Sequence, residues 1–177
     1  RQGKYNEALK ALKVAESIIP DSKPLIMLLG NTYRRLGMLD DAEQVLKRGR
    51  LVFPEDCEML NNLGNIYMAK GVYSEAEEAY RTAMRTLHED PRILNNLGVL
   101  RMQTNNLDDA ESLFRKASKL RPQWKTPLKN LEHLAKRMEI LENNIEQVRE
   151  EYRKHPNYLD IGLNLGMCLS EEFFNDD

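Results

Sequence analysis

A short phrase recurs along the chain at a fixed interval, and it constrains the fold more than any other feature. Leu29-Gly30 returns as Leu63-Gly64 and as Leu97-Gly98, in steps of 34 residues. A fixed period of roughly 20 to 50 residues is typical of stacked structural repeats, each a small supersecondary unit. The chain is therefore expected to fold as an array whose core extends along the stack of units.

Four further landmarks keep the same step. The first is an alanine: Ala8, Ala42, Ala76 and Ala110. A large apolar residue follows, at Leu12, Leu46, Tyr80 and Phe114, and then a small residue, at Ala15, Gly49, Ala83 and Ala117. The closing position is Pro20, Pro54, His88, Pro122 and Pro156. This pattern resembles the tetratricopeptide repeat (TPR), whose units carry Leu-Gly, then Ala, an aromatic residue and Pro over 34 residues. The resemblance covers essentially the whole chain.

The resemblance implies an all-α fold, a right-handed superhelical solenoid of antiparallel helix pairs that forms a single domain over residues 1–177. Its parts are expected to be a half repeat with only a second helix at 1–22, full repeats at 23–56, 57–90 and 91–124, a divergent repeat at 125–158, and a terminal helix and tail at 159–177. The unit at 125–158 diverges because Glu132 replaces the glycine, and Asn144 and Glu151 replace alanines. We expect a longer or shifted second helix there.

Local signals place the helix ends. Apolar residues recur at helical spacing between the landmarks, which predicts two helices per unit. Capping signals are expected where helices begin: Asp40-x-x-Glu43, Ser74-x-x-Glu77, Asp108-x-x-Glu111, Asp90-Pro91 and Thr126-Pro127. Gly37, Gly71 and Asn105 are expected to end first helices in the left-handed conformation.

The small landmark residues predict close contacts between the two helices of a unit. The residues expected to permit this approach are Gly30, Gly64, Gly98, Ala42, Ala76 and Ala110. The larger residues expected to fill the space beside them are Tyr33, Tyr67, Leu46, Tyr80 and Phe114. A single unit cannot bury this surface alone, so neighbouring units are expected to stack.

Composition and motifs exclude several function classes. The net charge of −2 argues against a nucleic-acid binder, and no stretch approaches the roughly 18 apolar residues of a membrane span. The sequence contains no glycine-rich phosphate-binding loop, no GxSxG motif, no HExxH motif and no EF-hand loop. We therefore expect no catalytic activity, no cofactor and no metal ion. Cys57 and Cys168 stand far apart, which favours a reducing, cytoplasmic location, or one on a membrane or organelle reached through partners. The chain opens at Arg1 without a methionine, so we expect it to be a piece of a longer protein.

One set of asparagines points to ligand binding. In the TPR family the first helix of each pair lines the concave surface, so the resemblance implies that the residues two places before each landmark glycine face the groove. These are Asn62, Asn96 and Asn164. Asn130 is the equivalent residue of the divergent unit, and the first full unit has Leu28 instead. Such an asparagine row suits the backbone of an extended peptide because each amide offers donors and an acceptor. Similar rows occur in the TPR segments of glycosyltransferase and motor-adaptor proteins. The alternative is that Asn-Asn-Leu-Gly is only common wording for this repeat.

Further polar residues are expected on the same surface. Asn31 and Asn65 follow landmark glycines, and cations surround the row: Arg34, Arg92, Lys129 and Lys136. The cations favour a ligand of acidic character. The dicarboxylate clamp of chaperone-binding TPR domains needs a lysine one turn ahead of such an asparagine, where this chain has Met27 or Asn61. Arg34-Arg35 and Lys136-Arg137 have an alternative interpretation as solvated helix ends. Trp124 is expected to be a packed residue in the turn between helices, and the alternative is a platform for a ligand.

Three functions remain open. The leading hypothesis is a non-catalytic adaptor that binds a peptide or protein segment in the concave groove. The second is a self-assembling bacterial scaffold of an organelle, pilus or secretion system, the magnetosome-associated type included, which forms homo-oligomers through the solenoid ends. The third is the regulatory TPR arm of a larger enzyme. Fold alone does not name the partner.

Overall fold

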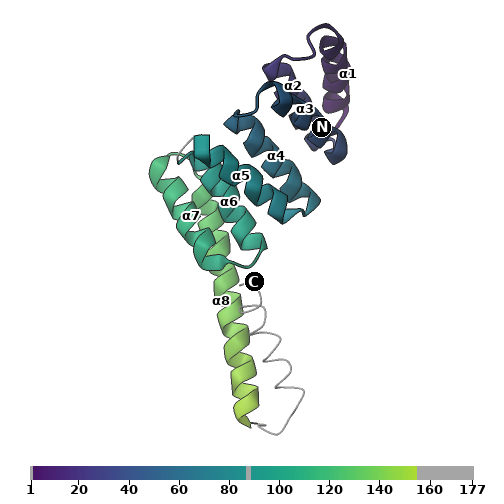
Figure 1. Cartoon of the computed structure of the whole chain (residues 1–177). Helices are drawn as coiled ribbons and strands as arrows, with labels where there is room; N and C mark the ends of the chain where they lie inside the picture. Colours follow the sequence, from purple (N-terminus) through teal and green to yellow (C-terminus); the bar gives the residue numbers. More distant parts are fainter. Residues whose placement is uncertain (1, 87–88, 155–177) are drawn as a thin grey trace. The chain divides into compact units, whose positions relative to one another are not determined.

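The computed structural model describes residues 2–86 and 89–154, and these residues form eight α-helices and no strand (Figure 1). The helices are α1 (Gln2–Ile18), α2 (Lys23–Arg35), α3 (Leu39–Val52), α4 (Cys57–Lys70), α5 (Tyr73–Thr86), α6 (Pro91–Gln103), α7 (Leu107–Leu120) and α8 (Thr126–Lys154). The predicted all-α fold is therefore confirmed. Helices α2 and α3 fall within residues 23–56, α4 and α5 within 57–90, and α6 and α7 within 91–124.

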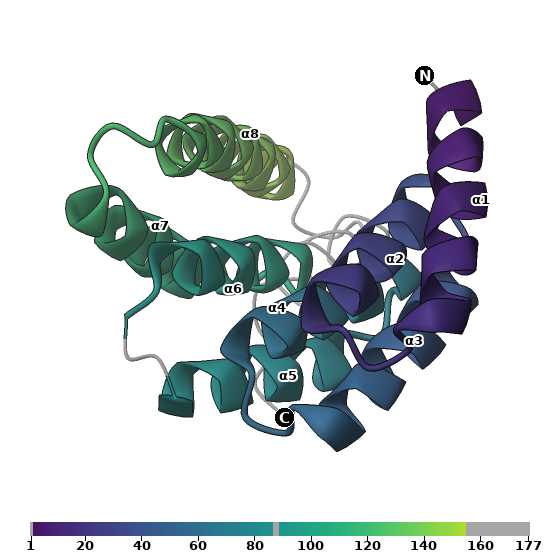
Figure 2. The same cartoon turned by 90° about the horizontal axis from the view of Figure 1, so that it is seen from above.

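The chain divides into two compact units, Arg1–Asn96 and Leu97–Asp177, and α6 contributes to both. In the first unit the helices pack in chain order, with α1 on α2, α2 on α3, α3 on α4 and α4 on α5 (Figure 2). Helices α2 and α4 also touch each other. This order is what stacked antiparallel helix pairs produce.

The close helix contacts predicted at the landmark glycines are present. A Cβ atom added to Gly64 would lie 2.4 Å from Cε1 of Tyr80, and one added to Gly98 would lie 2.6 Å from Cε1 of Phe114. The rings of Tyr80 and Phe114 are fully buried. The large residue of the second helix thus packs directly against the glycine of the first helix, and the two helices approach each other closely.

Each unit has its own apolar core. In the first unit, the buried cluster is formed by α2, α3, α4 and α5: Leu25, Ile26, Met27, Leu29, Tyr33, Ala42, Leu46, Met59, Leu63, Ile66 and Ala79. In the second, Met102, Ala110, Phe114 and Leu134 form a smaller cluster from α6, α7 and α8. The landmark residues supply much of both clusters, as expected for a core that runs along the stack.

The turns between first and second helices have the predicted left-handed residue. The φ angle is 78° at Gly37, 74° at Gly71 and 63° at Asn105. After each of these, the next backbone N–H returns to the preceding helix; Val72, for example, donates to the carbonyl of Tyr67 at 2.9 Å. Backbone hydrogen bonds of this kind satisfy the carbonyls that a helix end leaves open.

The predicted capping boxes are wrong for α3 and α7. The residue before α3 is Met38 and the one before α7 is Asn106, and neither makes a side-chain capping bond. Because the left-handed turn is so short, each helix begins before the acidic pair, which therefore lies inside the first turn. Acidic residues there still interact favourably with the helix dipole.

Of the other three predicted helix starts, one is confirmed and two are wrong. Helix α5 begins at Tyr73, so Ser74 lies already within it. Asp90 does cap α6, since its carboxylate accepts the backbone N–H of Arg92 at 2.7 Å. Thr126 does not precede its helix, because α8 already begins at Thr126.

In the described part of the expected divergent repeat, residues 125–154, one continuous helix, α8, of 29 residues stands in place of a helix pair. In the regular units a left-handed residue ends the first helix, at Gly37, Gly71 and Asn105. The equivalent residue 34 positions after Asn105 is Glu139, and glutamate favours the helix. Asn144 and Glu151, which replace the small landmark residues, are exposed. With no turn residue and no small apolar face, the second half of the unit continues straight.

Candidate functional site

The candidate site is the surface of the first helices that carries the asparagine row and its cations. The first unit contains Asn31 and Arg34 on α2, Asn62 and Asn65 on α4, and Arg92 and Asn96 on α6. The second contains Lys129, Asn130 and Lys136 on α8. Asn164 lies outside the described residues. The two groups are treated separately below.

A hydrogen-bond network joins two of the predicted residues in the first unit, Asn65 and Asn96, to Asn61. The Nδ2 atom of Asn96 donates to Oδ1 of Asn61 at 2.9 Å and to Oδ1 of Asn65 at 3.0 Å. The hydroxyl of Tyr80 donates to the same oxygen of Asn65 at 2.8 Å. The N–H groups of Asn96 are thus used within the protein, so any further hydrogen bond of this side chain would involve its amide oxygen.

Asn62 is held much more weakly than Asn96. Its Nδ2 atom lies 3.8 Å from the sulfur of Met27, which is a poor acceptor, and the side chain is half-buried. Leu28, which replaces asparagine one unit earlier, is 55% exposed. Asn62 therefore retains most of its hydrogen-bonding capacity, and an apolar side chain lies at the head of the row.

Arg34 is a half-buried cation without a carboxylate partner among the described residues. Burial lowers the pKa of its guanidinium, as does the positive charge of Arg35, whereas the phenols of Tyr80 and Tyr5 act in the opposite direction. Tyr80 is the residue whose hydroxyl holds Asn65, so Arg34 lies close to the asparagine network. A partly desolvated guanidinium with unused donors is well suited to a carboxylate.

Arg92, by contrast, already has a carboxylate partner. Its Nη2 atom lies 2.8 Å from Oδ2 of Asp90. Burial acts to raise the pKa of Asp90, but the hydrogen bonds from Arg92 outweigh it and hold that pKa below its ordinary value. Arg92 is therefore a weaker candidate for reading an acidic ligand than Arg34.

In the second unit the predicted residues lie along one helix. Lys129 and Lys136 are exposed on α8, and Asn130 between them is half-buried and interacts within the protein. Arg137 is half-buried and hydrogen-bonded within the protein, so it is not a solvated helix end. It donates to the carbonyl of Met102 at 2.9 Å and to Oδ1 of Asn105 at 2.8 Å, and so closes the end of α6.

Sequence reasoning missed two of these roles. The bond between Tyr80 and Asn65 follows from the landmark contact, because Asn65 comes directly after Gly64, on which the Tyr80 ring rests. The partial burial of Arg34 had no signal in the sequence, since a polar pair at a helix end is equally compatible with a solvated position. Trp124, as expected, is half-buried between α7 and α8.

The described residues contain no cluster of three or more His, Cys, Asp or Glu side chains that could hold a metal ion. Among the same residues, no helix has the length and apolar character needed to cross a membrane. Cys57 is a half-buried free thiol, and Cys168 lies outside the described residues.

Several solved structures resemble this chain. A chain of the APC/C hetero-tetramer Cut9–Hcn1 matches at 18% identity and a TM-score of 0.72, over 96% of this chain and 34% of that one. The thermophilic TPR protein TTC0263 of Thermus thermophilus matches at 20% identity and a TM-score of 0.71, over 94% and 91%. The first TPR of Spaghetti (RPAP3), bound to an HSP90 peptide, matches at 18% identity and a TM-score of 0.59, over 64% and 90%. The chain thus spans about a third of the Cut9–Hcn1 chain that it resembles.

Comparison with family models gives the same result along the sequence. One tetratricopeptide repeat model matches residues 1–64 and a second matches residues 55–123. The comparison with curated proteins gave no match. The landmark contacts, the helix pairs and these matches agree, and the chain belongs to the tetratricopeptide repeat family.

Proposed function

We propose that this chain is a non-catalytic scaffold that binds an extended, acidic protein segment along the first helices of its repeats. The TPR fold serves protein–protein interaction in general, through surfaces built from successive repeats. We further propose where the segment binds and which side chains select it. Its backbone is held by asparagine side chains, and its carboxylates by cations of the same surface.

The half-buried guanidinium of Arg34, which has no carboxylate partner in residues 2–86 and 89–154, is the observation that carries this proposal. A buried charge without a partner is unfavourable, and a ligand carboxylate would supply the missing partner. Nearby, the amide oxygen of Asn96 and the weakly held amide of Asn62 offer an acceptor and donors to a peptide backbone. The second unit has its own pair of exposed cations, Lys129 and Lys136, and the site at Arg34 does not depend on them.

Two of the similar structures support a protein ligand. The Spaghetti domain was solved with an HSP90 peptide of sequence SRMEEVD, which is acidic, and Cut9 was solved in an assembly with Hcn1. This chain has Met27 where a clamp for such a chaperone peptide needs a lysine. We therefore propose an acidic segment held by Arg34 and asparagines, and not a chaperone C-terminus.

The neighbouring arginine provides a matched control for the test. A fluorescein-labelled peptide of alternating glutamate and serine is titrated with the full chain, and its glutamine–serine counterpart is the neutral reference. Arg34→Gln is expected to weaken binding about tenfold, and Arg35→Gln less than about twofold, because Arg35 is exposed. Equal effects of the two substitutions, or equal binding of the two peptides, would contradict the proposal.

Self-association is the second candidate, and one feature favours it. Val14 and Ile18 lie one turn apart on α1 and are 64% and 73% exposed. Adjacent exposed apolar side chains favour association because contact removes them from water. Sedimentation equilibrium of the chain and of a Val14→Lys/Ile18→Lys variant tests this. A monomer at high micromolar concentration in both would remove this candidate.

A further inference from the structure

Among the described residues, no second helix of its own unit packs on α8 as one does in every regular unit. In those units the landmark glycine of the first helix meets a large residue of the second, as Gly64 meets Tyr80 and Gly98 meets Phe114. The counterparts in the last unit are Glu132 and Val148, and both lie on α8. At 1.5 Å per residue they are about 24 Å apart along one axis, so they cannot meet. Val148 therefore does not occupy the position beside Glu132 that the large residue of a second helix has in a regular unit.

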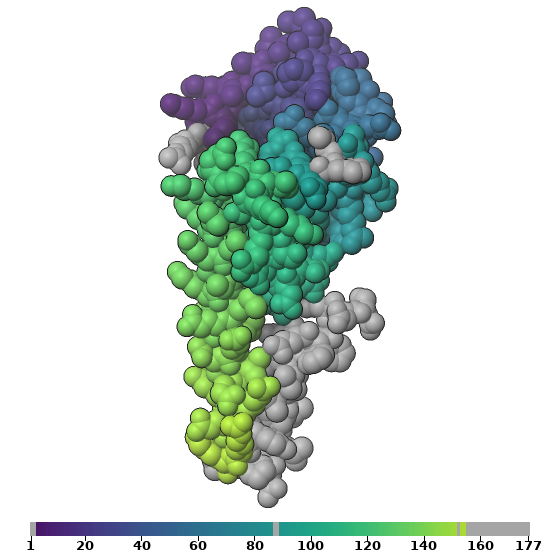
Figure 3. Space-filling view, turned by 90° about the vertical axis from the view of Figure 1, so that its left-hand side faces the viewer, coloured from purple at the N-terminus to yellow at the C-terminus, as the bar shows by residue number. Residues whose placement is uncertain are grey.

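A groove lies where that second helix would pack. Its volume is about 550 Å³, and it is lined by α7 and by the N-terminal half of α8. Leu131, Leu134, Ala135 and Met138 supply its apolar side chains. Leu134 and Met138 also belong to or border the core of this unit, so the groove is an opening onto that core. The exposed surfaces of α7 and α8 are seen in Figure 3.

The rim of the groove is acidic. Arg115 is neutralised by Glu111, whose Oε1 atom lies 2.6 Å from its Nη2. The other charged residues of the lining are Glu132, Glu139 and Glu142, which are exposed and form no ion pair with any described residue. Three uncompensated carboxylates beside an apolar surface favour a ligand that is both apolar and basic.

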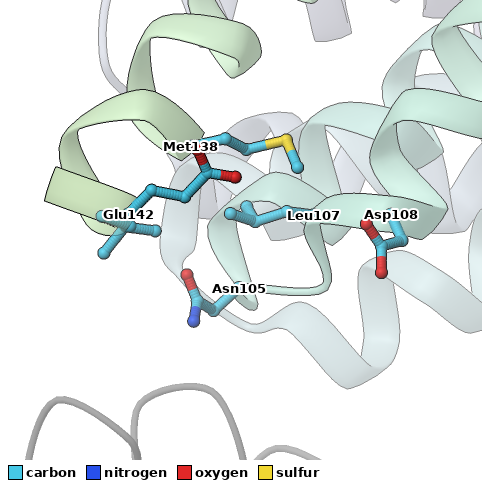
Figure 4. Close-up of a pocket in the computed structure, with 6 residues that line it drawn as sticks. Asn105, Leu107, Asp108, Met138 and Glu142 are labelled. Atoms are coloured by element: carbon cyan, nitrogen blue, oxygen red, sulfur yellow. The ribbon is translucent and has the colours of Figure 1, made fainter. Parts of the chain in front are cut away.

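A second, smaller cavity continues the groove. It has a volume of about 260 Å³ and shares Met138 and Glu142 with the first (Figure 4). Leu107 and Leu141 add apolar surface, and Asp108 adds a further carboxylate. The acidic, apolar surface thus runs along α8 from Leu131 to Glu142, about three helical turns, which is long enough to hold a short helix.

We propose that this groove binds an amphipathic, lysine- or arginine-bearing helix of a partner protein, which packs where the second helix of a regular unit would lie and where the described residues place none. Its apolar stripe would cover Leu131, Ala135 and Met138, and its cations would pair with Glu132, Glu139 and Glu142. Binding of an amphipathic helix in an apolar groove is a common recognition mode. The proposal does not depend on the acidic segment proposed above, because the two surfaces involve different residues and select ligands of opposite charge.

A probe with the required chemistry is available in this chain itself. The sequence of α1, residues 2–18, has the landmark pattern of a second helix in Ala8, Leu12 and Ala15, and carries Lys4, Lys10 and Lys13. A labelled synthetic peptide of this sequence is titrated with the full chain by fluorescence anisotropy. Ala135→Trp, which fills the groove, is expected to weaken binding at least about tenfold. Ala69→Trp, at an exposed alanine of α4, is the matched control and should change binding less than about twofold.

A charge exchange then separates recognition from a damaged fold. Glu139→Lys should weaken binding of the probe, and a probe with Lys10→Glu and Lys13→Glu should bind this variant better than the original chain. The proposal is overturned if Ala135→Trp leaves the affinity unchanged, if the full chain does not bind the probe at high micromolar concentration, or if the exchanged charges fail to restore binding. It is equally overturned if sedimentation shows that Ala135→Trp abolishes self-association of the chain, because the occupant is then a second copy.

Discussion

Asn96 donates a hydrogen bond of 2.9 Å to Asn61, which lies one helix pair earlier in the chain. The two asparagines of the recurring Asn-Asn-Leu-Gly phrase therefore have different roles. The first of each pair, Asn61 and Asn95, is 9% and 5% exposed, whereas Asn62 and Asn96 are half-buried. The asparagine row is thus partly a device that joins neighbouring first helices, which sets a limit on its use in ligand binding.

This difference predicts that Asn96→Ala destabilises the fold more than Asn62→Ala. Loss of Asn96 leaves the amide oxygen of Asn61 without its donor inside the protein, at a cost of about 1–3 kcal/mol. Asn62 loses only a weak contact with a sulfur atom, so the expected cost is below about 1 kcal/mol. Urea denaturation followed by circular dichroism measures both. Equal midpoints for the two variants would show that the Asn96 bonds do not stabilise the fold.

Alanine substitutions of three glycines should form a graded series. Gly64→Ala places a methyl group 2.4 Å from the Tyr80 ring and should cost about 1–3 kcal/mol. Gly30→Ala places it 2.9 Å from Cγ and Cδ2 of Leu46, a less severe overlap than at Gly64, so the cost should be smaller. Gly3→Ala meets nothing within 4 Å and should be neutral or stabilising by up to about 1 kcal/mol. A thermal midpoint of Gly64→Ala equal to that of Gly3→Ala would mean that α4 and α5 are paired differently.

Tyr80 should make the protein sensitive to alkaline pH. Burial raises the pKa of its phenol above the ordinary value of 10.0, and the charge of Arg34 offsets this in part. Above about pH 10 the unfolded chain releases this proton while the folded chain keeps it, so stability falls as pH rises, by up to about 1.4 kcal/mol per pH unit. Below pH 10 the contribution is fully present.

The measurement compares Tyr80→Phe with the original chain in denaturant titrations from pH 9 upward. Since phenylalanine carries no proton to release, its stability should decline less steeply, even if its absolute stability is lower through loss of the bond to Asn65. Parallel pH profiles would show that Tyr80 titrates normally in the folded state.

Adjacent asparagines allow a controlled test of the turn between α6 and α7. Asn105 has a positive φ angle, and its side chain accepts a bond from Arg137 at 2.8 Å. Asn105→Ala should therefore cost about 1–2 kcal/mol through strain and a lost hydrogen bond. Asn106 makes no side-chain capping bond, so Asn106→Ala should change stability by less than about 0.5 kcal/mol. Fluorescence of Trp124, the single tryptophan, reports unfolding of this part of the chain.

The repeat period was sufficient to predict the fold because it acts through local rules. The glycines and large residues of one unit are close in sequence, so their contacts, such as Gly98 with Phe114, could be expected from spacing. Helix ends were predicted less well, because the acidic pair at Asp40-Asp41 suits either a cap or a first turn, and only the backbone of the short Gly37 turn decides between them.

The candidate site was harder to predict, because its properties depend on contacts between repeats. Spacing placed Asn96 on the correct helix, but not the two acceptors that use its N–H groups. The same holds for Arg137, which has the sequence appearance of a surface cation and yet closes the end of α6. That Arg34 has no carboxylate partner in the part of the chain that the structure describes is likewise a property that no local pattern encodes.

The uninterrupted course of α8 also has a mechanical consequence. A helix of 29 residues is about 43 Å long at 1.5 Å per residue, and its hydrogen bonds make it stiff along its axis. The C-terminal end of α8 at Lys154 is thus held at a set distance from the turn at Trp124, as by a rigid rod. A single substitution of Glu139 by a residue that breaks the helix would replace this rigid connection by a flexible one.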